Sequence, residues 1–463
     1  MASDELWRKG AGELAALIRA GSVSSVEVVQ AHLDRIAAVN PSVNAVTVVL
    51  AETALDAARA ADTVPSAGRG PLHGVPFTIK ENIDAVGSAT TQGVPAMVDA
   101  VPPVDAPIVE RMKAAGAIPL ARTNLPEFGM RISTDNPLRG RTNNPWSPLV
   151  CAGGSSGGEG AALASGMTPI GLGNDIGGSL RNPSFCCGTT AIKPTHGRVP
   201  QASAIPPIDP MAAAQVMATD GPMARCIADV RLGLSVLNGR HVRDPRSVSV
   251  ALEGPPVDVR VAALAVDLPG LPPSFVDAIR RAGAALEADG WKVVEATPPG
   301  VATIGEVWIA MMKLGVEDML PLVGGVMSPA AVGLLQSLVE IPAPPPAVAF
   351  VERHRLQREW SAFFADHPVV VGPTWCDVQF PHDADIAPDG AGVEVTLGRL
   401  PFILPGNLLG IPGVAVPTGV DGDTGLPLGV QVYADLWRDD LALDAAERIE
   451  SALGTVTPID PAS

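Results

Sequence analysis

One lysine and two serines in this chain have surroundings that could support nucleophilic catalysis. Lys80 ends the apolar run VPFTI, and Ser155 and Ser179 lie in the glycine-rich turns GGSSGGEG (153–160) and GLGNDIGGSLRNP (171–183). Burial of a lysine disfavours its ammonium form, so its pKa falls and a neutral amine becomes available as a base. Glycines let the backbone approach closely, and successive N–H groups of such a turn can stabilise an oxyanion. The three residues are therefore candidates for a base and its hydroxyl partners.

Each residue also has an ordinary structural interpretation. A lysine at the end of a strand can extend to solvent, and serines are frequent in turns.

Nucleotide binding is disfavoured because no lysine follows Gly157 or Gly158, as a phosphate loop requires. The pair Gly171 and Gly173 is followed by Ile176 where a dinucleotide fingerprint needs glycine.

A serine-hydrolase elbow is a second catalytic hypothesis for the first turn. Residues 153–157 fit the pattern G-x-S-x-G, which would make Ser155 the nucleophile. Two prolines interrupt the preceding stretch NPWSPLVCA, so the strand that should lead into an elbow is not evident. The base would then be one of five histidines: His196, His241, His354, His367 or His382.

Short apolar runs alternate with helical patterns along the chain, and this predicts an α/β fold. We expect a large mixed, mostly parallel central sheet with helices covering both faces. The expected strands are residues 75–79, 117–121, 259–266, 291–296, 368–373, 412–417 and 428–433.

Capping residues predict where three of the helices begin. The capping box of Ser24 and Glu27 starts a helix that we expect to stop at Asn40-Pro41. Asp105 is expected to cap a helix that ends near Gly116, and Ser274 one that ends at Gly290.

The chain shows no internal repeat and no long linker, which predicts a single domain over residues 1–463. The stretch IPAPPP (341–346) is short and apolar, so we interpret it as a rigid loop within the domain. Residues 200–365 are the most irregular part of the pattern.

Composition disfavours several classes of function. The net charge of −17 repels phosphate backbones, which argues against nucleic-acid binding. No run of 18 apolar residues is present, so no membrane span is expected, and the start MASDELWRKG has no hydrophobic signal core. We expect a cytoplasmic protein with reduced thiols, because the cysteine count is odd and no C-x-x-C pair occurs. The cysteines are Cys151, Cys186, Cys187, Cys226 and Cys376.

Three linked stretches resemble the motifs of the amidase signature family. They are GVPFTIKENI (74–83), GGSSGGEGAALASG (153–166) and GLGNDIGGSLRNPSFCCGTTAIKPTHGRV (171–199). The spacing also matches, with 75 residues from Lys80 to Ser155 and 24 from Ser155 to Ser179. Supporting similarity lies in ARTNLPEFG and in GIPGVAVPTGVDGDTGLPLGVQV, so the resemblance covers most of the chain except about 200–365.

The resemblance implies the amidase signature fold and a Ser–Ser–Lys triad that cleaves C–N bonds through an acyl-enzyme. Ser179 would be the nucleophile, and Ser155, typically preceded by a cis peptide, would relay the proton to Lys80. No metal or cofactor is implied. The oxyanion would be held by the backbone N–H groups of Ile176, Gly177, Gly178 and Ser179.

Some residues depart from the common family pattern. Threonine usually stands at the position of Asn174 and often at that of Ile176, whose isoleucine form is similar to fatty acid amide hydrolase and its relatives. The stretch SFCCGTTAIKP is less alanine-rich than usual. Lys193 within it is typical of the family, and we interpret it as structural.

The expected substrate is a small-molecule amide with a hydrophobic or aryl group, and carbamates (urethanes) and esters are also expected to react. Gly129, the last residue of the NLPEFG motif, and Met130 beside it are the predicted substrate-binding residues, and we expect a monomer or homodimer. An alternative is the glutamine-hydrolysing component, known as the A subunit, of a tRNA-dependent amidotransferase complex. An apolar stretch at residues 308–322 favours the free-standing amidase, because it could form an apolar substrate pocket. The alternative is that this stretch only packs in the core. It contains Trp308, Met311, Met312, Leu314, Met319, Leu320 and Leu322.

Overall fold

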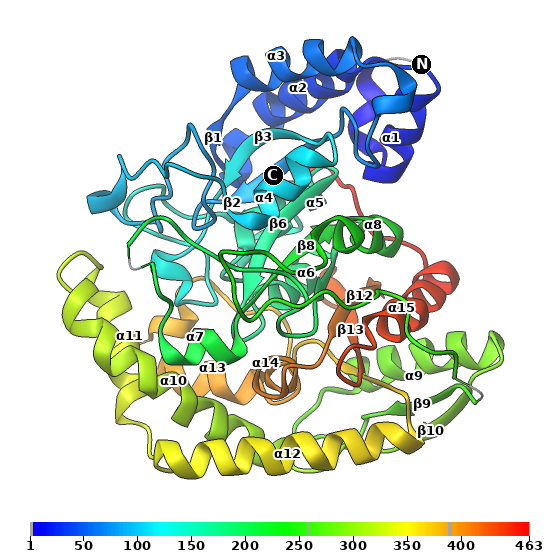
Figure 1. Ribbon diagram of the computed structural model, residues 1–463. Coiled ribbons are helices and arrows are strands. Elements are labelled where there is room, and N and C mark those ends of the chain that lie inside the picture. The colour runs from blue at the N-terminus through cyan, green and yellow to red at the C-terminus, as the bar shows by residue number, and fades with distance from the viewer. Residues whose placement is uncertain (1–2, 207, 258, 388–390, 463) are drawn as a thin grey trace.

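A large central sheet organises the computed structural model, which describes residues 3–206, 208–257, 259–387 and 391–462 (Figure 1). Within these residues the sheet has eleven strands. From one edge to the other they are β1 (Val46–Val49), β3 (Ile118–Thr123), β2 (Pro76–Lys80), β6 (Ile170–Asp175), β8 (Thr219–Ala224), β7 (Thr190–Lys193), β12 (Gly413–Val420), β13 (Pro427–Ala434), β11 (Val369–Pro373), β9 (Val261–Leu264) and β10 (Lys292–Glu295). A separate hairpin is formed by β4 (Asn143–Asn144) and β5 (Ser147–Cys151).

The mixed character of this sheet is confirmed, but antiparallel pairings are more frequent than expected. Strand β2 runs parallel to β3 and β6, and β9 runs parallel to β10 and β11. The other six pairings described within the sheet are antiparallel. Two features contribute three of these antiparallel pairings. Consecutive strands β12 and β13 are joined by a short turn, and β8 enters between β6 and β7 in the opposite direction to both.

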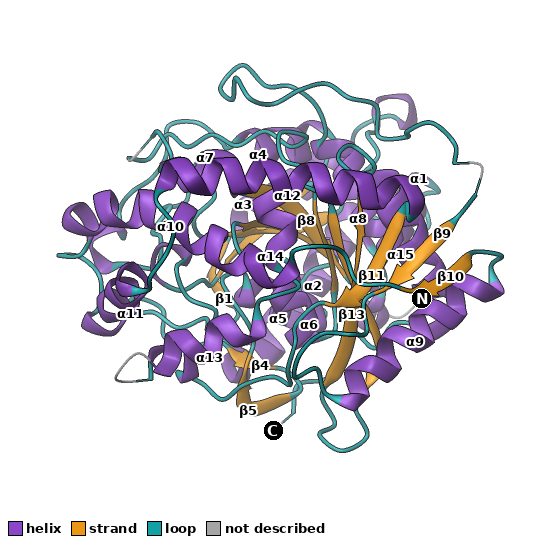
Figure 2. Ribbon diagram, turned by 90° about the horizontal axis from the view of Figure 1, so that it is seen from below, coloured by secondary structure: helices purple, strands orange, loops and turns teal. Residues whose placement is uncertain are grey.

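Helices cover both faces of the sheet, as predicted, and Figure 2 shows the strands between them. Side chains alternate along each strand, so Val370 joins one apolar core whereas Val369 and Val371 join the other. The core of Val371 is closed mainly by α1 (Ala11–Arg19), α4 (Pro107–Ala114), α8 (Ile227–Leu237), α9 (Pro273–Ala288) and α15 (Asp439–Leu453). The core of Val370 is closed mainly by α2 (Ser25–Val43), α3 (Ala51–Asp62), α5 (Gly157–Ala164), α6 (Arg181–Cys187), α7 (Ala212–Met217), α10 (Val301–Val323), α11 (Pro329–Glu340), α12 (Pro346–Asp366), α13 (Ala391–Arg399) and α14 (Leu404–Leu409).

The capping box at the start of α2 is confirmed, but the predicted end of this helix is wrong. The Ser24 hydroxyl accepts from the N–H of Glu27 at 3.1 Å, and the Glu27 carboxylate accepts from the N–H of Ser24 at 2.7 Å. The helix continues through Pro41 to Val43. The proline removes one N–H donor from the helix, and the helix ends two residues beyond it.

The two other predicted caps are also wrong. Helix α4 begins at Pro107, and the Asp105 carboxylate instead accepts from the N–H of Val86 and from Lys113, both at 2.7 Å. Helix α9 begins at Pro273, so Ser274 lies inside its first turn. In both helices a proline takes the first helical position, where its fixed φ suits the helix and its missing N–H costs nothing.

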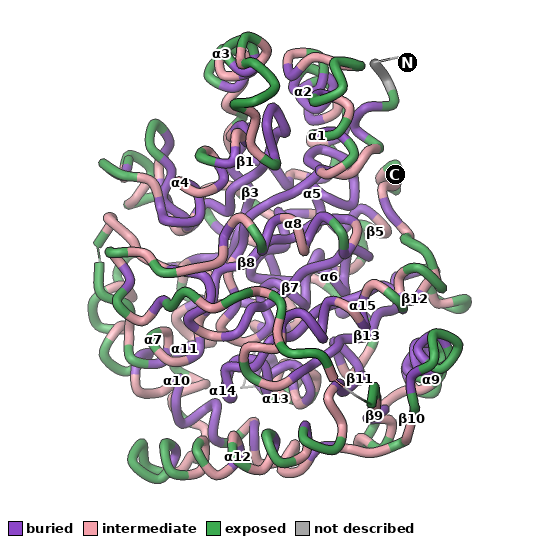
Figure 3. Tube along the Cα trace, turned by 45° about the vertical axis from the view of Figure 1, so that its right-hand side comes forward, coloured by how far each residue is buried: buried purple, intermediate pink, exposed green. Residues whose placement is uncertain are grey.

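The middle of the chain is more regular than its sequence pattern indicates. Strands β8, β9 and β10 from residues 200–365 belong to the central sheet. The long helices α10 and α12 come from the same region, and α12 lies at the opposite end of the molecule from α1–α3 (Figures 1 and 3). The predicted loop at 341–346 is confirmed for residues 341–345, because α11 ends at Glu340 and Pro346 already begins α12.

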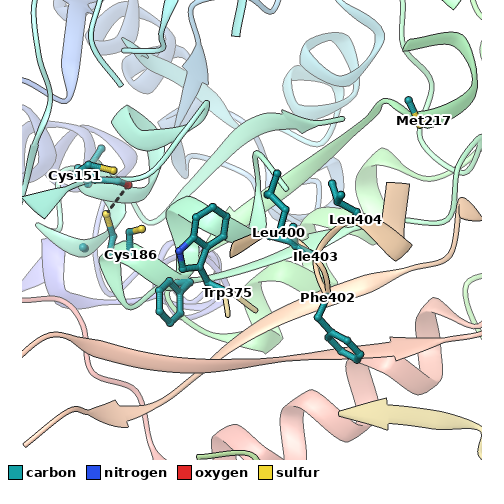
Figure 4. Packing of buried hydrophobic residues seen from close by; sticks show 14 of the residues in the cluster. Cys151, Cys186, Met217, Trp375, Leu400, Phe402, Ile403 and Leu404 are labelled. Carbon is teal, nitrogen blue, oxygen red and sulfur yellow. Dashed lines mark hydrogen bonds between the residues drawn. The ribbon is translucent and has the colours of Figure 1, made fainter. Parts of the chain in front are cut away.

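Most residues in the interior of the molecule are buried, as the colours along the Cα trace show (Figure 3). Figure 4 shows aromatic and aliphatic residues of one core, among them Trp375, Phe402 and Ile403, all almost fully buried. All five cysteines are free thiols, and Cys151 and Cys186 are buried. None of the helices in the described part of the chain is long and apolar enough to cross a bilayer.

Candidate active site

Lys80 is the last residue of β2, between two parallel neighbours, and its side chain is fully buried. Alternation along the strand places Phe77 and Ile79 in one core and turns Lys80 toward the opposite face. Its Nζ donates to Ser155 Oγ at 2.7 Å and to Asn174 Oδ1 at 2.7 Å. The predicted lysine and one predicted serine are therefore in direct contact.

Burial determines the protonation of Lys80. Desolvation lowers its pKa to about 7, although the charges of nearby carboxylates oppose the shift. Lys193 is equally buried and its pKa is also lowered to about 7, but its Nζ donates to the carbonyl of Pro194. A lowered lysine pKa thus occurs twice among the described residues. The hydroxyl partner distinguishes Lys80. The opposing carboxylates are Asp175, Asp220 and Glu159.

The Ser155 turn connects β5 to α5 and is tied to the Ser179 turn by backbone groups. The peptide between Gly154 and Ser155 is cis, as the family resemblance implies. The N–H of Gly154 donates to Asn182 Oδ1 at 3.0 Å, and the N–H of Ser156 donates to the Ser179 carbonyl at 3.2 Å. One bond on each side of Ser155 therefore fixes its position relative to Ser179.

Gly129 and Met130, the predicted substrate-binding residues, lie beside the same serine. Gly129 has a φ of +69°, and a Cβ added there would stand 3.2 Å from Ser155 Oγ. A larger residue would combine a strained backbone with crowding of the hydroxyl. Both Gly129 and Met130 line the cavity into which Ser179 also opens.

Asp175 braces the turn that carries Ser179. Its carboxylate accepts from the N–H groups of Gly178 at 2.7 Å and Leu180 at 3.1 Å, and it forms a buried ion pair with Arg181. Burial alone would raise the pKa of Asp175, but Arg181 outweighs it and holds the pKa at about 2. The N–H of Gly178 is therefore already bound within the loop. This contradicts the expectation that Gly178 contributes a free donor to an oxyanion hole.

Two other amide N–H groups of this turn, those of Ile176 and Ser179, are oriented indirectly. In each case a hydrogen bond holds the carbonyl oxygen of the peptide group to which the N–H belongs. Asn407 Nδ2 donates to the Asp175 carbonyl at 3.0 Å, and the N–H of Asn182 donates to the Gly178 carbonyl at 2.7 Å. In a trans peptide the C=O and N–H point in opposite directions, so fixing one aims the other. The amides aimed in this way belong to Ile176 and Ser179.

A cavity extends from Ser179 and is lined mainly by apolar side chains. Of the apolar stretch predicted to form it, Trp308 and Met312 line the cavity, being one helical turn apart on α10. Met311 packs in the core, three other members are partly buried against it, and Leu322 is 80% exposed, so the prediction is wrong for these five. The three partly buried members are Leu314, Met319 and Leu320. The remaining apolar residues of the cavity wall are Met130, Ile132, Ile176, Leu334, Leu335, Leu338, Val393, Leu397 and Leu400.

The structure adds residues that the sequence analysis did not assign to the site. Asn174, noted only as a departure from threonine, contacts Lys80, and its Nδ2 donates to Asn82 Oδ1 at 3.0 Å. Asn82 lies two positions after Lys80, and this proximity in sequence could have indicated that Asn82 belongs to the site. Asn407 is distant in sequence and gave no local indication. Among the described residues, the nitrogen that donates to Ser155 Oγ belongs to Lys80 and not to a histidine, which disfavours the elbow hypothesis.

Comparison with known proteins identifies the family of this chain. A family model described as Amidase matches residues 27–318 and 347–443. The chain is 42% identical to an indoleacetamide hydrolase of Bradyrhizobium diazoefficiens, over 97% of this chain and 88% of the relative. It is 33% identical to the A subunit of the glutamyl-tRNA(Gln) amidotransferase of Salinispora tropica, over 97% and 98% of the two chains. The solved structure of 6-aminohexanoate cyclic dimer hydrolase complexed with substrate superposes with a TM-score of 0.82 at 28% identity, covering 97% of this chain and 98% of that one. This protein therefore belongs to the amidase signature family of amide hydrolases.

Proposed function

We propose that this protein hydrolyses amides with an apolar, aromatic group, using Ser179 as nucleophile, Ser155 as proton relay and Lys80 as base. The observation that carries the proposal is the 2.7 Å hydrogen bond between Lys80 Nζ and Ser155 Oγ, in a turn tied to that of Ser179. Burial of the lysine supports its role, because a pKa of about 7 leaves much of the amine neutral near neutral pH.

In the first step Ser179 Oγ attacks the amide carbonyl carbon as its proton passes to Ser155 Oγ. Ser155 passes its own proton to neutral Lys80, which becomes an ammonium. The tetrahedral oxyanion accepts hydrogen bonds from the amides of Ile176, Gly177 and Ser179. The proton then returns through Ser155 to the departing nitrogen, the C–N bond breaks, and an ester to Ser179 remains.

Water completes the cycle by the same route. It attacks the ester carbonyl while its proton passes through Ser155 to Lys80, and the acid leaves as Ser179 recovers its proton. Proton return is essential for an amide, because a neutral amine leaves far more readily than an amide anion. An ester or carbamate with a good alcohol leaving group needs this protonation less, so both remain within reach of the same site.

The substrate proposal rests on the cavity and on the relatives. Most of the cavity that contains Ser179 is apolar, with Trp308 and Met312 in its wall, and this suits an aromatic ring; its charged pair, Arg131 and Asp385, is bound to itself. A relative with 42% identity is named for indoleacetamide hydrolysis. We therefore propose arylacetamides, indole-3-acetamide among them, as the first substrates to examine.

Two measurements test this proposal. A panel of indole-3-acetamide, benzoyl anilide, a phenyl carbamate, acetamide and glutamine should give the highest kcat/KM for an aromatic amide. An aryl sulfonyl fluoride, followed by peptide mass spectrometry, should modify Ser179 in the peptide containing DIGGSLR. Faster turnover of glutamine contradicts the substrate proposal, and an adduct on Ser155 contradicts the assignment of the nucleophile.

A glutamine-hydrolysing component of an amidotransferase is the second candidate. It is supported by the 33% identity to such a protein over almost the whole of both chains. The cavity is mainly apolar, and its two charged residues, Arg131 and Asp385, already pair with each other at 2.9 Å, so it is less suited to an α-amino acid, whose ammonium and carboxylate groups need polar partners. Hydrolysis of an aromatic amide by the purified protein, without any partner protein, favours the free-standing enzyme. The same purified protein also tests the expected monomer or homodimer by light scattering.

A further inference from the structure

Trp308 connects the apolar cavity to the turn that carries Ser179. Trp308 belongs to α10, and its indole is almost fully buried. The indole Nε1–H donates to the carbonyl of Ile176 at 3.0 Å. The ring also lies against the next residue, because a Cβ added to Gly177 would stand 2.8 Å from Trp308 Cζ2. The glycine is thus what allows the indole to approach the loop backbone.

The hydrogen bond of Trp308 fixes the peptide between Ile176 and Gly177. The carbonyl of this peptide belongs to Ile176 and its N–H to Gly177, and the peptide is trans. Because the two groups point in opposite directions, an indole that holds the carbonyl turns the N–H of Gly177 away from itself. This completes the pattern in the turn, where Asn407 and Asn182 hold the carbonyls of two other peptides.

We propose that Trp308 is a positioning residue that aims the N–H of Gly177 at the oxyanion while its ring forms a wall of the substrate cavity. The inference rests on the proposed function, because it presumes that the reacting carbonyl lies at Ser179. Trp308 comes from a region that the motifs do not cover. Because its ring lines the cavity and its N–H holds the turn, it would couple the fit of the substrate group to the alignment of an oxyanion donor. Such an interaction strengthens as charge develops on the oxygen and is therefore expected to act on kcat.

Trp308→Phe removes the indole N–H but keeps an aromatic wall. Deleting an oxyanion donor outright costs about 10²–10³-fold in kcat, and here the donor stays while its orientation is loosened, so we expect a fall of about tenfold. KM for an aromatic amide should change by less than about threefold, and the pH midpoint should stay where it is because Lys80 is untouched. Affinity for an aryl trifluoromethyl ketone, which presents an oxyanion on binding, should fall in parallel with kcat/KM.

Two further variants separate the positioning role from a structural one. Replacing Trp308 with 3-benzothienylalanine exchanges the N–H for sulfur at nearly constant shape, and it should reproduce the loss in kcat in a folded protein with an unchanged thermal midpoint. Met312→Ala is the matched control, since Met312 lines the same cavity one turn away. It should raise KM and leave kcat within about twofold.

The outcomes distinguish this inference from the proposed function. If the wild type cleaves aromatic amides and is trapped at Ser179, but the benzothienyl variant keeps full kcat, the positioning role is wrong and the proposed function stands. A rise in KM alone with that variant also overturns the inference, because the indole would then act only as a wall. Failure of the wild type to form the Ser179 adduct contradicts the proposed function itself.

Discussion

Replacing Asn174 with aspartate would place a carboxylate against Lys80 with almost no change in side-chain shape. In the wild type, Asn174 Oδ1 accepts from Lys80 Nζ at 2.7 Å, and burial lowers the pKa of this lysine to about 7. An opposite charge within hydrogen-bond distance stabilises the ammonium form. The pKa of Lys80 should therefore rise in Asn174→Asp, which removes base at neutral pH.

The size of the effect follows from the shift. A neighbouring opposite charge typically moves a pKa by about 1–3 units. With a wild-type pKa of about 7, half of the lysine is neutral at pH 7. A rise of one unit would reduce the neutral fraction, and with it kcat/KM, about fivefold at pH 7, and a rise of two units about fiftyfold. Activity should recover as the pH is raised above the new midpoint.

The assay is kcat/KM for an aromatic amide from pH 5 to pH 10. The wild type should rise through a midpoint near 7 and reach an alkaline plateau, and Asn174→Asp should reach its plateau at least one unit higher. Asn143→Asp makes the same change of net charge in the β4–β5 hairpin and should leave the midpoint unchanged. A folded Asn174→Asp enzyme with the wild-type midpoint would refute the assignment of Lys80 as the base.

Other predictions concern the triad as a unit. Lys80→Met should lower kcat/KM for an amide by about 10²–10⁴-fold and for a matched ester by less, because the ester leaves with little help from a proton. Lys193→Met removes the other buried lysine of lowered pKa and should keep the wild-type midpoint of the pH profile. If the pH dependence of kcat/KM is lost in this variant instead, Lys193 and not Lys80 is the base. The double variant of Lys80→Met and Ser179→Ala should be little worse than Ser179→Ala alone, since residues that act as a unit are not additive, and a multiplied loss would argue for independent roles. Prolonged chelation with EDTA should leave full activity, and a loss restored by zinc would contradict a metal-free mechanism.

Much of the site could be predicted from the sequence because its signals are local. An apolar strand that ends in Lys80 and two serines inside glycine turns are visible in short stretches, and the family motifs added their spacing. The geometry agrees with the motifs where a contact depends on these stretches, as in the bond between Lys80 and Ser155. The capping box of α2 was predictable for the same reason, since Ser24 and Glu27 bind each other within one turn.

The predictions that failed concern two kinds of residue. Some have partners that are close in space but not evident in the sequence, and others lie where two local signals compete. The N–H of Gly178 looked free in a glycine turn, but the carboxylate of Asp175 turns back to bind it. Asn407 orients the same turn from a helix more than 200 residues away, and no nearby pattern indicates it. At the start of α4, Asp105 is a good capping residue, yet Pro107 sets the boundary and leaves the carboxylate to bind Lys113.

Register in the sheet explains why the base and its acceptor meet at all. Strands β2 and β6 run parallel, with Thr78 opposite Gly171 and Ile79 opposite Leu172, so both strands end at the same edge. Lys80 at the end of one strand then reaches Asn174 near the end of the other. A slip of one residue in β2 would turn Lys80 to the face now occupied by Phe77 and Ile79, away from both glycine turns. Glu159 opposes such a slip, because its carboxylate accepts from the hydroxyls of Thr78 on β2 and Thr123 on β3. The pairing of these strands, more than any single contact in the site, thus decides that the buried amine faces a hydroxyl.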